Sequence, residues 1–267
     1  MSGPHGLVYL NGEYVPASEA RVPVSDRGFA YGDGAFTTLR VAGGEPLLLD
    51  RHLRRLLRDL AALRISPPSP EELAAACRGL VERLEMGEGV VKITVTRGPG
   101  ARGPSPGKGG EPTVVVTASG LPEPRPPLRA VSVPDARGSL VRHKTLNYLT
   151  SVLALWEAEV SGRDEAVFVR DGELLEASVS NLAGVADGEL LTPPAGRGLL
   201  PGVVREVLLE AGTVAEGPLP VDTGGPLYCI NAVRGVEPVA ELDGRGLALD
   251  RGLEERLRGV LGESGAL

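Results

Sequence analysis

The chain has 267 residues, of which 42% are hydrophobic and 24% charged, and its formal net charge is −7. This negative charge argues against a nucleic-acid-binding surface, because neutralising phosphates requires clustered Lys and Arg. No apolar run is long enough to cross a bilayer and the N-terminus lacks a signal-peptide pattern, so we expect a cytoplasmic protein without a membrane partner.

The N-terminal part of the chain predicts two β-hairpins and a helix. An Asn11-Gly12 pair separates two short extended runs, which is a strong hairpin signal, and Gly43-Gly44 repeats the pattern. The stretch "DRHLRRLLRDLAAL" then spaces its leucines as on one face of a helix, with Asp50 available as the N-cap.

The next part predicts a second helix, two strands and a long loop. "SPEELAAACRGLVERLEM" opens with Ser69 and Glu72 at the spacing of a capping box, and "GVVKITVTRG" and "TVVVTAS" are typical of strands. Between these strands lies "GPGARGPSPGKGGEP", a Gly/Pro-rich loop that carries Arg102 and Lys108. Long loops in compact domains are either disordered or functional.

The C-terminal part follows a connector that contains four prolines between residues 122 and 127, and it mixes helices with strands. Helices are expected at about 146–161, 201–211 and 251–262, and strands near 165–169, 174–176, 181–186, 227–230 and 236–240. We therefore expect an α/β (α+β) fold with a small domain at 1–118, a linker at 119–128 and a larger domain at 129–267. Cys77 and Cys229 sit among apolar residues, which predicts buried thiols and no metal site.

One lysine is placed where an amine could do covalent chemistry. Arg supplies most of the positive charge, and the only lysines are Lys92, Lys108 and Lys144. Lys144 directly precedes an apolar run, and an amine can attack a carbonyl whereas Arg stays protonated. A GC-rich genome would also make lysine scarce, and a solvated lysine near a helix start remains the alternative. If Lys144 is an active amine, pyridoxal phosphate is a leading candidate for the carbonyl.

That cofactor requires an acid facing its pyridine nitrogen and an anion site for its phosphate. Glu176 ends a predicted strand among small residues, where a flat ring could approach. The predicted helix that starts at Pro201 would expose the N–H groups of Gly202, Val203 and Val204, and Arg55 could add a fixed cation. Taken singly, these features also fit a surface glutamate, an ordinary helix start and a solvated basic face.

Five motifs together resemble a known family. "VSDRGFAYGDGAFTTLR", "RHLRRL", "HKTLNYL", "LLEASVSNL" and "LLPGVVRE" occur in the order seen in class-IV aminotransferase-like enzymes of fold type IV, which use pyridoxal 5'-phosphate. That family includes branched-chain and D-amino acid aminotransferases and 4-amino-4-deoxychorismate lyases. The resemblance runs from about Leu7 to Pro238, and it implies the two-domain fold and a homodimer.

The resemblance also implies individual roles. Lys144 matches the Schiff-base lysine, Glu176 the acid at the pyridine nitrogen, and Arg55, in a pattern begun by His52, the phosphate-binding arginine. Lys92 lies in mid-strand and Lys108 in the loop, so neither competes for the aldehyde. The other positions implied to contact the cofactor are Tyr148, Ser180, Asn181, Gly202, Val203, Val204 and Asn231.

Departures from the branched-chain pattern favour the lyase. The chain has Phe36-Thr37-Thr38 in place of Phe-Glu-Thr, Gly202-Val203-Val204-Arg205 in place of Gly-Ile-Thr-Arg, and Asn231-Ala232 in place of a Ser-Gly-Thr stretch. All three changes are similar to aminodeoxychorismate lyases, although Pro104 replaces an aromatic residue that is usual in their loop.

The lyase would eliminate pyruvate from 4-amino-4-deoxychorismate and leave p-aminobenzoate, a small-molecule reaction of folate synthesis. Lys144 would remove the proton from the amine-bearing carbon, and Thr38 could relay a proton to the departing group. The residues expected to bind the substrate are Tyr31, Lys92, Arg97 and Arg102. The alternatives are an aminotransferase of D- or branched-chain amino acids, and a non-catalytic relative that binds the cofactor.

Overall fold

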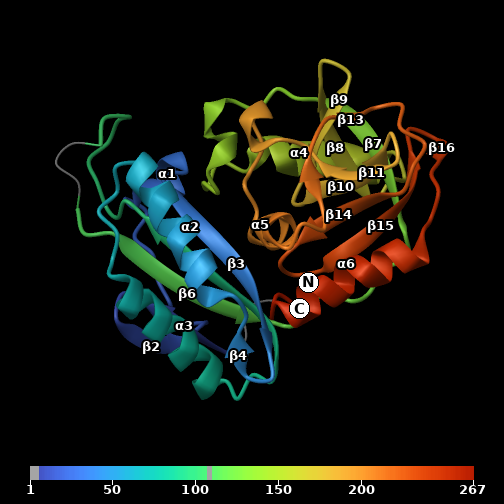
Figure 1. Ribbon diagram of the computed structural model, residues 1–267. Coiled ribbons are helices and arrows are strands. Elements are labelled where there is room, and N and C mark those ends of the chain that lie inside the picture. Colours follow the sequence, from blue (N-terminus) through green and yellow to red (C-terminus); the bar gives the residue numbers. More distant parts are fainter. Residues whose placement is uncertain (1–5, 107–109) are drawn as a thin grey trace. The chain divides into compact units, whose positions relative to one another are not determined.

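The computed structural model describes residues 6–106 and 110–267, which form two compact units (Figure 1). Unit 1 comprises Met1–Pro122 with His143–Asn147, and unit 2 comprises Glu123–Arg142 with Tyr148–Leu267. The division after Pro122 falls within the predicted 119–128 linker. The prediction assigned all of 129–267 to the C-terminal domain, whereas the structure places His143–Asn147 in unit 1. Lys108 lies outside the described residues.

Unit 1 is a six-stranded sheet covered on one face by helices. The strand order is β2-β1-β6-β5-β3-β4. Its strands are β1 (Leu7–Leu10), β2 (Glu13–Pro16), β3 (Gly34–Ala42), β4 (Glu45–Pro46), β5 (Glu88–Thr96) and β6 (Thr113–Ser119), and its helices are α1 (Arg27–Tyr31), α2 (Leu49–Ala62) and α3 (Pro70–Arg83). Both predicted hairpins are confirmed, β1–β2 at Asn11-Gly12 and β3–β4 at Gly43-Gly44.

The starts of α2 and α3 show one wrong and one correct prediction. At α3 the capping box is confirmed, because the Ser69 hydroxyl accepts from the Glu72 N–H (3.1 Å) and the Glu72 carboxylate accepts from the Ser69 N–H (3.0 Å). At α2 the predicted N-cap, Asp50, is wrong. Leu48 is the N-cap, in the left-handed region with φ 49°, and Asp50 lies in the first turn. The helix extends to Leu49 because that side chain is buried in the core.

The alternation of side chains along β3 and β5 separates two faces of the sheet. Leu39, Val41, Val91 and Ile93 belong to the core that α2 and α3 cover (Figure 1). Side chains one position away point to the opposite face. Thr38 is paired with Lys92 in the β3–β5 register, so these two side chains share that opposite face.

The short segment His143–Asn147 belongs to unit 1 because it forms hydrogen bonds with the start of β3. The Phe36 N–H donates to the Lys144 carbonyl (2.9 Å) and the Leu146 N–H donates to the Gly34 carbonyl (2.9 Å). Ala35 and Thr145 form the bridge between these bonds. The lysine that the sequence singles out is thereby fixed to a strand more than 100 residues earlier in the chain.

Unit 2 contains a mixed sheet in the order β12-β11-β10-β14-β15-β7-β8-β9-β13, with β16 paired to β15. Its strands are β7 (Leu128–Pro134), β8 (Glu165–Arg170), β9 (Glu173–Ala177), β10 (Asn181–Ala186), β11 (Glu189–Thr192), β12 (Ala215–Glu216), β13 (Leu219–Pro220), β14 (Leu227–Asn231), β15 (Gly235–Leu242) and β16 (Arg245–Gly246). The helices are α4 (Leu149–Val160), α5 (Val203–Glu210) and α6 (Arg251–Glu263), with 3-10 turns at Ser139–Arg142 and Ala195–Arg197.

The three predicted C-terminal helices are confirmed, although α4 begins at Leu149 instead of residue 146 and α5 begins at Val203 instead of Pro201. Gly202 is its N-cap and has an extended backbone conformation. The prediction of buried thiols is also confirmed, since Cys77 and Cys229 are both fully buried. Within the described part of the chain, no helix has the length and apolar character needed to cross a membrane.

Candidate functional site

Two amines of unit 1 lie against the same aromatic ring. The Lys144 Nζ is 4.8 Å from the centre of the Phe36 ring, and the Lys92 Nζ is 4.4 Å from it. We call Phe36, Thr38, Lys92 and Lys144 the lysine group. Desolvation of the Lys92 amine, and then the positive charge of Lys144, lower the pKa of Lys92 from its ordinary value of 10.5. The lysine group therefore places two amines and the Thr38 hydroxyl on neighbouring positions of unit 1.

Asp59 of α2 holds the segment that carries Lys144. Its side chain is fully buried, and one carboxylate oxygen accepts from the Lys144 backbone N–H (3.0 Å). The other oxygen accepts from His143 Nδ1 (2.9 Å) and from the Arg58 guanidinium (3.0 Å). The backbone on both sides of Lys144 Cα is thus fixed, by α2 and by β3.

A second cluster, the arginine group, consists of Thr37, His52 and Arg55 and is buried. Arg55 donates from Nη2 to the Thr37 hydroxyl (3.0 Å), and that hydroxyl lies 2.8 Å from His52 Nδ1. Burial, followed by the charges of Arg55 and Lys144, lowers the pKa of His52 well below 6.5. His52 is therefore neutral near pH 7, and since the Thr37 hydroxyl accepts from Arg55, it donates its own proton to Nδ1.

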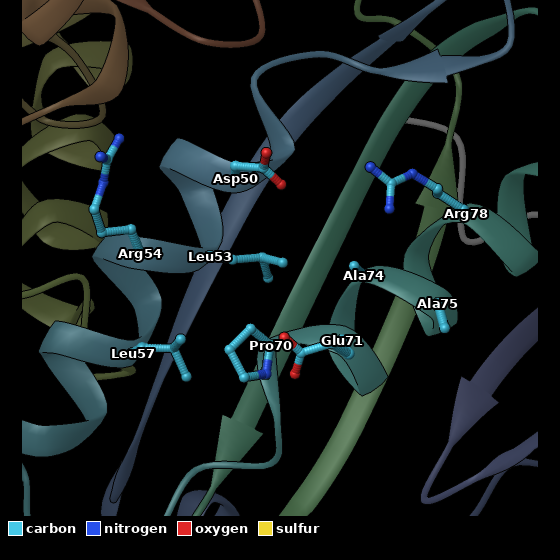
Figure 2. Close-up of a pocket in the computed structure, with 9 residues that line it drawn as sticks. All are labelled: Asp50, Leu53, Arg54, Leu57, Pro70, Glu71, Ala74, Ala75 and Arg78. Atoms are coloured by element: carbon cyan, nitrogen blue, oxygen red, sulfur yellow. The ribbon is translucent and has the colours of Figure 1, made fainter.

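Helical spacing explains why α2 supplies these groups. His52, Arg55 and Asp59 are separated by three and four residues and so lie along one side of the helix. Leu53, Arg54 and Leu57 lie on another side, where α2 and α3 form a pocket of about 640 Å³ (Figure 2). None of the residues predicted for the site lines this pocket, which is bounded by Asp50, Leu53, Arg54, Leu57, Pro70, Glu71, Ala74, Ala75 and Arg78.

The predicted substrate-binding residues Tyr31, Arg97 and Arg102 lie in different surroundings. The Tyr31 hydroxyl accepts from the Gly103 N–H (2.8 Å), next to Arg102, whose side chain is exposed. Arg97 donates two bonds to Asp33 and one each to the carbonyls of Leu63 and Arg64. Arg97 therefore has a structural role, because all its bonds hold other parts of unit 1, whereas Arg102 has an exposed guanidinium close to Tyr31.

In unit 2, Glu176 is buried and held by several donors. Arg137 donates to its carboxylate, Asn181 donates from Nδ2 (3.2 Å), and the Leu200 N–H lies 3.1 Å from Oε2. We call Arg137, Glu176, Asn181 and Leu200 the glutamate group. Asp135 orients Arg137 in turn, at 2.7 Å from its Nε. These contacts fix the position of the Glu176 carboxylate.

The start of α5 is next to the glutamate group. Gly202 caps the helix without a side-chain hydrogen bond, so the first N–H groups of α5 lack an intrahelical partner. A Cβ at Gly202 would lie 2.1 Å from Asn181 Oδ1. Asn181 cannot easily swing away, because its Nδ2 also donates to the Leu200 carbonyl (2.8 Å). Glycine is therefore required where the helix presents its N–H groups.

The remaining predicted cofactor contacts occupy ordered positions in unit 2. Asn231 donates from Nδ2 to the Ser180 hydroxyl (2.9 Å), and its Oδ1 accepts from the N–H groups of Val233 and Arg234, both at 2.9 Å. Tyr148 is the N-cap of α4 and is half-buried. Ser180 and Asn231 thus stabilise one turn together.

Sequence reasoning missed Asp59, His143, Arg137 and Asp135. Asp59 and His143 are 84 residues apart, and Arg137 lies 39 residues before Glu176, so no local pattern links them. The one available signal was the helical spacing of Asp59 with the predicted His52 and Arg55.

The residues present fit pyridoxal 5'-phosphate. An amine at Lys144, a buried guanidinium at Arg55, a fixed carboxylate at Glu176 and an open helix start at Val203 are the groups that this cofactor needs. Among the described residues, Nη2 of Arg137 is a buried donor with no hydrogen-bond acceptor, beside Glu176. A polar ligand would satisfy it.

Comparisons with known proteins agree with this assignment. Residues 34–242 match the family described as "Amino-transferase class IV". A Methanocaldococcus jannaschii protein provisionally named a branched-chain-amino-acid aminotransferase is 34% identical over 260 residues, covering 89% of this chain and 88% of that protein. D-alanine aminotransferase of Staphylococcus aureus (strain N315) is 32% identical over 251 residues, covering 89% of each chain.

Solved structures share the fold. A hypothetical aminotransferase from Mycobacterium tuberculosis, in its PLP-bound form, superposes with a TM-score of 0.87 at 23% identity, over 97% of this chain and 98% of that one. A Legionella pneumophila protein provisionally named 4-amino-4-deoxychorismate lyase gives 0.85 at 23% identity, over 93% and 97%. The chain belongs to the class IV aminotransferase family, with the fold type IV architecture and the dependence on pyridoxal 5'-phosphate of that family.

Proposed function

We propose that the protein is a 4-amino-4-deoxychorismate lyase that releases p-aminobenzoate and pyruvate in the cytoplasm, for folate synthesis. The observation that carries the proposal is the pairing of Thr38 with Lys92 beside Phe36 and Lys144. This arrangement adds a hydroxyl and a second amine to the single amine that a transamination requires. The motifs Phe36-Thr37-Thr38 and Asn231-Ala232 support the same substrate.

The reaction is an elimination without a net change of oxidation state. The ring carbon that bears the amine loses a proton, the neighbouring C–O bond breaks with its electrons on the oxygen, and the released enol of pyruvate takes a proton at its methylene. When bound, pyridoxal phosphate withdraws electrons from the amine-bearing carbon. The chain must therefore supply one proton acceptor, one proton donor and groups that hold two carboxylates.

Unit 1 offers a residue for each task. The Lys144 amine is the base, because β3 and Asp59 fix its backbone. Thr38 is the proposed donor to the departing enol, and Lys92 and Arg102 are the proposed cations for the carboxylates. Tyr31 would position the loop that carries Arg102, since its hydroxyl accepts from the Gly103 N–H. Because Arg97 already donates four hydrogen bonds within unit 1, its proposed role is supporting.

In unit 2, Glu176 is proposed to hold the ring nitrogen, and the first N–H groups of α5 are proposed to bind the phosphate. In unit 1, Arg55 is the proposed cation for the phosphate. Tyr148, Ser180, Asn181 and Asn231 are proposed to line the cofactor. This assignment makes Lys144 the amine that bonds to the cofactor in the resting protein and that acts as the base once substrate is bound, and Lys92 a substrate ligand.

The test is a product assay on purified protein loaded with pyridoxal phosphate. We expect equal release of p-aminobenzoate and pyruvate from aminodeoxychorismate. T38V should lower kcat about 10²- to 10⁴-fold, the range of a lost proton-transfer group, with little change in cofactor content. T38S keeps the hydroxyl and is the matched control. A T38V enzyme with wild-type kcat would remove Thr38 from the proton path, and no product from the wild type would refute the lyase.

An aminotransferase of D-amino acids or branched-chain amino acids is the second candidate. The observation in its favour is the identity of 34% and 32% with relatives that carry those names. Adding D-alanine, D-glutamate or L-leucine to the holoenzyme distinguishes the two. Conversion of the cofactor to its pyridoxamine form, with release of the keto acid, would establish the aminotransferase. A cofactor spectrum that stays unchanged by all three amino acids favours the lyase.

A further inference from the structure

Arg27, at the start of α1, is a buried arginine outside the lysine, arginine and glutamate groups. Its side chain is 4% exposed, and its Nε donates to Asp33 Oδ2 (2.9 Å). The two Nη atoms donate to three successive carbonyls of the loop between β5 and β6. Nη1 donates to those of Gly103 (3.0 Å) and Ser105 (3.3 Å), and Nη2 to that of Pro104 (2.9 Å). The protein itself therefore engages all three nitrogens, and Arg27 holds the loop instead of a ligand.

The base of the same loop is fixed from the same place in the chain. The Asp26 carboxylate is fully buried and accepts from the hydroxyls of Thr96 (2.9 Å), at the end of β5, and Thr113 (2.7 Å), at the start of β6. The Arg27 backbone N–H donates to the Gly98 carbonyl (2.9 Å). Asp26 thus joins the two ends of the loop, and Arg27 connects the base of the loop to the three carbonyls.

Arg27 also contacts Tyr31, which is predicted to bind the substrate together with Arg102. The Arg27 guanidinium carbon lies 4.7 Å from the centre of the Tyr31 ring, which is a cation–π contact. The Tyr31 hydroxyl accepts from the Gly103 N–H (2.8 Å), and Gly103 has φ 113°, a conformation that favours glycine. Arg102 directly precedes Gly103. One buried side chain therefore fixes Tyr31 and the backbone next to Arg102 relative to each other.

Arginine is the side chain that this arrangement requires. A planar guanidinium presents five N–H donors in fixed directions, whereas a lysine amine has three donors on a single atom. The acceptors of Arg27 are distributed over three different nitrogens, so an amine at position 27 cannot reach all of them.

We propose that Arg27 is a positioning residue that determines recognition of the substrate carboxylate, because it holds Tyr31 and Arg102 in one arrangement. The proposal rests on the proposed role of Arg102 as a carboxylate cation. It covers both candidate reactions, since each of their substrates carries a carboxylate.

Cleavage by an arginine-specific protease tests the loop contact without any substrate. We expect the R27K holoenzyme to be cut at the Arg102–Gly103 bond about tenfold faster than the wild type, as followed by fragment mass. Each lost hydrogen bond is worth about a factor of two to ten, and cleavage follows the population of the locally opened loop. R21K is the matched control, because Arg21 is exposed and donates to carbonyls of its own turn. An R27K protein cut at the wild-type rate would overturn the proposal.

Steady-state kinetics test the link to the substrate. In R27K, KM for the substrate that the holoenzyme turns over should rise about tenfold or more, because a displaced Arg102 binds the carboxylate poorly. The kcat and the cofactor content should stay close to the wild-type values, which a general loss of structure would not allow. R102A should raise KM as well, and R27K/R102A should raise it no further than R102A alone, since both changes remove one interaction. Independent, multiplying effects on KM, or an unchanged KM in R27K, would contradict the proposal.

The two tests separate the role of Arg27 from the lyase assignment. Absence of p-aminobenzoate and pyruvate from the wild-type reaction would refute the lyase. The cleavage rates, and the KM values for an amino acid substrate, would then still decide on Arg27. A wild-type cleavage rate in R27K would refute the role of Arg27 whichever reaction the holoenzyme performs.

Discussion

Asp59 acts on the reacting lysine through the backbone. Its two oxygens bind the Lys144 N–H and His143 Nδ1, at 3.0 and 2.9 Å, from a fully buried position. Aspartate serves here because a carboxylate offers acceptors to both donors at once. Neither bond contacts substrate directly, so Asp59 is a positioning residue.

D59N tests this role. The amide keeps one acceptor and turns the other into a donor, which faces the Lys144 or His143 donor and costs about 1–3 kcal/mol. We expect kcat to fall about tenfold or more while KM changes little, since small misplacements of a reacting group are costly. D50N is the matched control, because Asp50 is exposed on the same helix. Equal kcat values for both variants would show that Lys144 does not depend on Asp59.

His52 gives a prediction about pH. Burial, Arg55 and Lys144 lower its folded-state pKa well below the ordinary 6.5. The unfolded chain therefore takes up a proton first as the pH falls, so the stability contributed by neutral His52 is present above pH 6.5 and is lost below it. The melting temperature should fall between pH 7.5 and 5.5, and H52N should show a shallower fall. Parallel curves for the two proteins would exclude this role of His52.

At the scale of single elements, the start of α5 combines a strict steric requirement with the proposed phosphate site. The helix requires glycine at 202, since a Cβ there would lie 2.1 Å from Asn181 Oδ1. Asn181 in turn holds Glu176 at 3.2 Å. One steric constraint therefore links the proposed phosphate site to the carboxylate proposed for the ring nitrogen.

G202A should weaken cofactor binding. Relieving the close contact must displace Asn181 or the helix start, at a cost of about 1–3 kcal/mol. We expect the apparent Kd for pyridoxal phosphate to rise about tenfold in a fluorescence titration. The same substitution at Gly196, where a Cβ would have no neighbour within 4 Å, is the control. If G202A binds the cofactor as tightly as G196A, the α5 start is not the phosphate site.

Elements with local signals could be predicted from the sequence, and elements set by packing could not. The hairpin at Asn11-Gly12 and the capping box at Ser69 are encoded within four residues, and both predictions are confirmed. The start of α2 depends on burial of Leu49 in a core built from distant strands, so Asp50 was a misleading signal. The Arg137–Glu176 pair depends on tertiary structure in the same way.

At the scale of the whole molecule, the chain returns to unit 1 after entering unit 2. Residues His143–Asn147 pair with β3 although their neighbours on both sides belong to unit 2. Proline content located the connector near Pro122, but no composition signal marks the return. The motif "HKTLNYL" identified Lys144, and its place in unit 1 is explained by the hydrogen bonds of Phe36, Leu146 and Asp59, which only the structure shows.

Each unit contains an ion-paired carboxylate whose lowered pKa should make the protein less stable in acid. Burial alone raises the pKa values of Asp33 in unit 1 and Asp135 in unit 2, but Arg97 with Arg27, and Arg137 with Arg170, outweigh it and leave both below 3.8. The stability they contribute is present above pH 3.8 and is lost as the pH falls through the folded-state values. Calorimetry between pH 6 and 2.5 should show this loss, and D135N should reduce it. An unchanged acid slope in D135N would contradict the prediction.

The central claim is that Lys144, and not the neighbouring Lys92, bonds to the cofactor. Both amines lie within 5 Å of the Phe36 ring centre, at 4.8 and 4.4 Å, so proximity to the ring alone does not distinguish them. Borohydride reduction of the holoenzyme, followed by peptide mass spectrometry, fixes the cofactor on the lysine that holds it. We predict that the pyridoxyl phosphate mass is found on the peptide containing Lys144. The same mass on Lys92, or on neither lysine, would contradict the account.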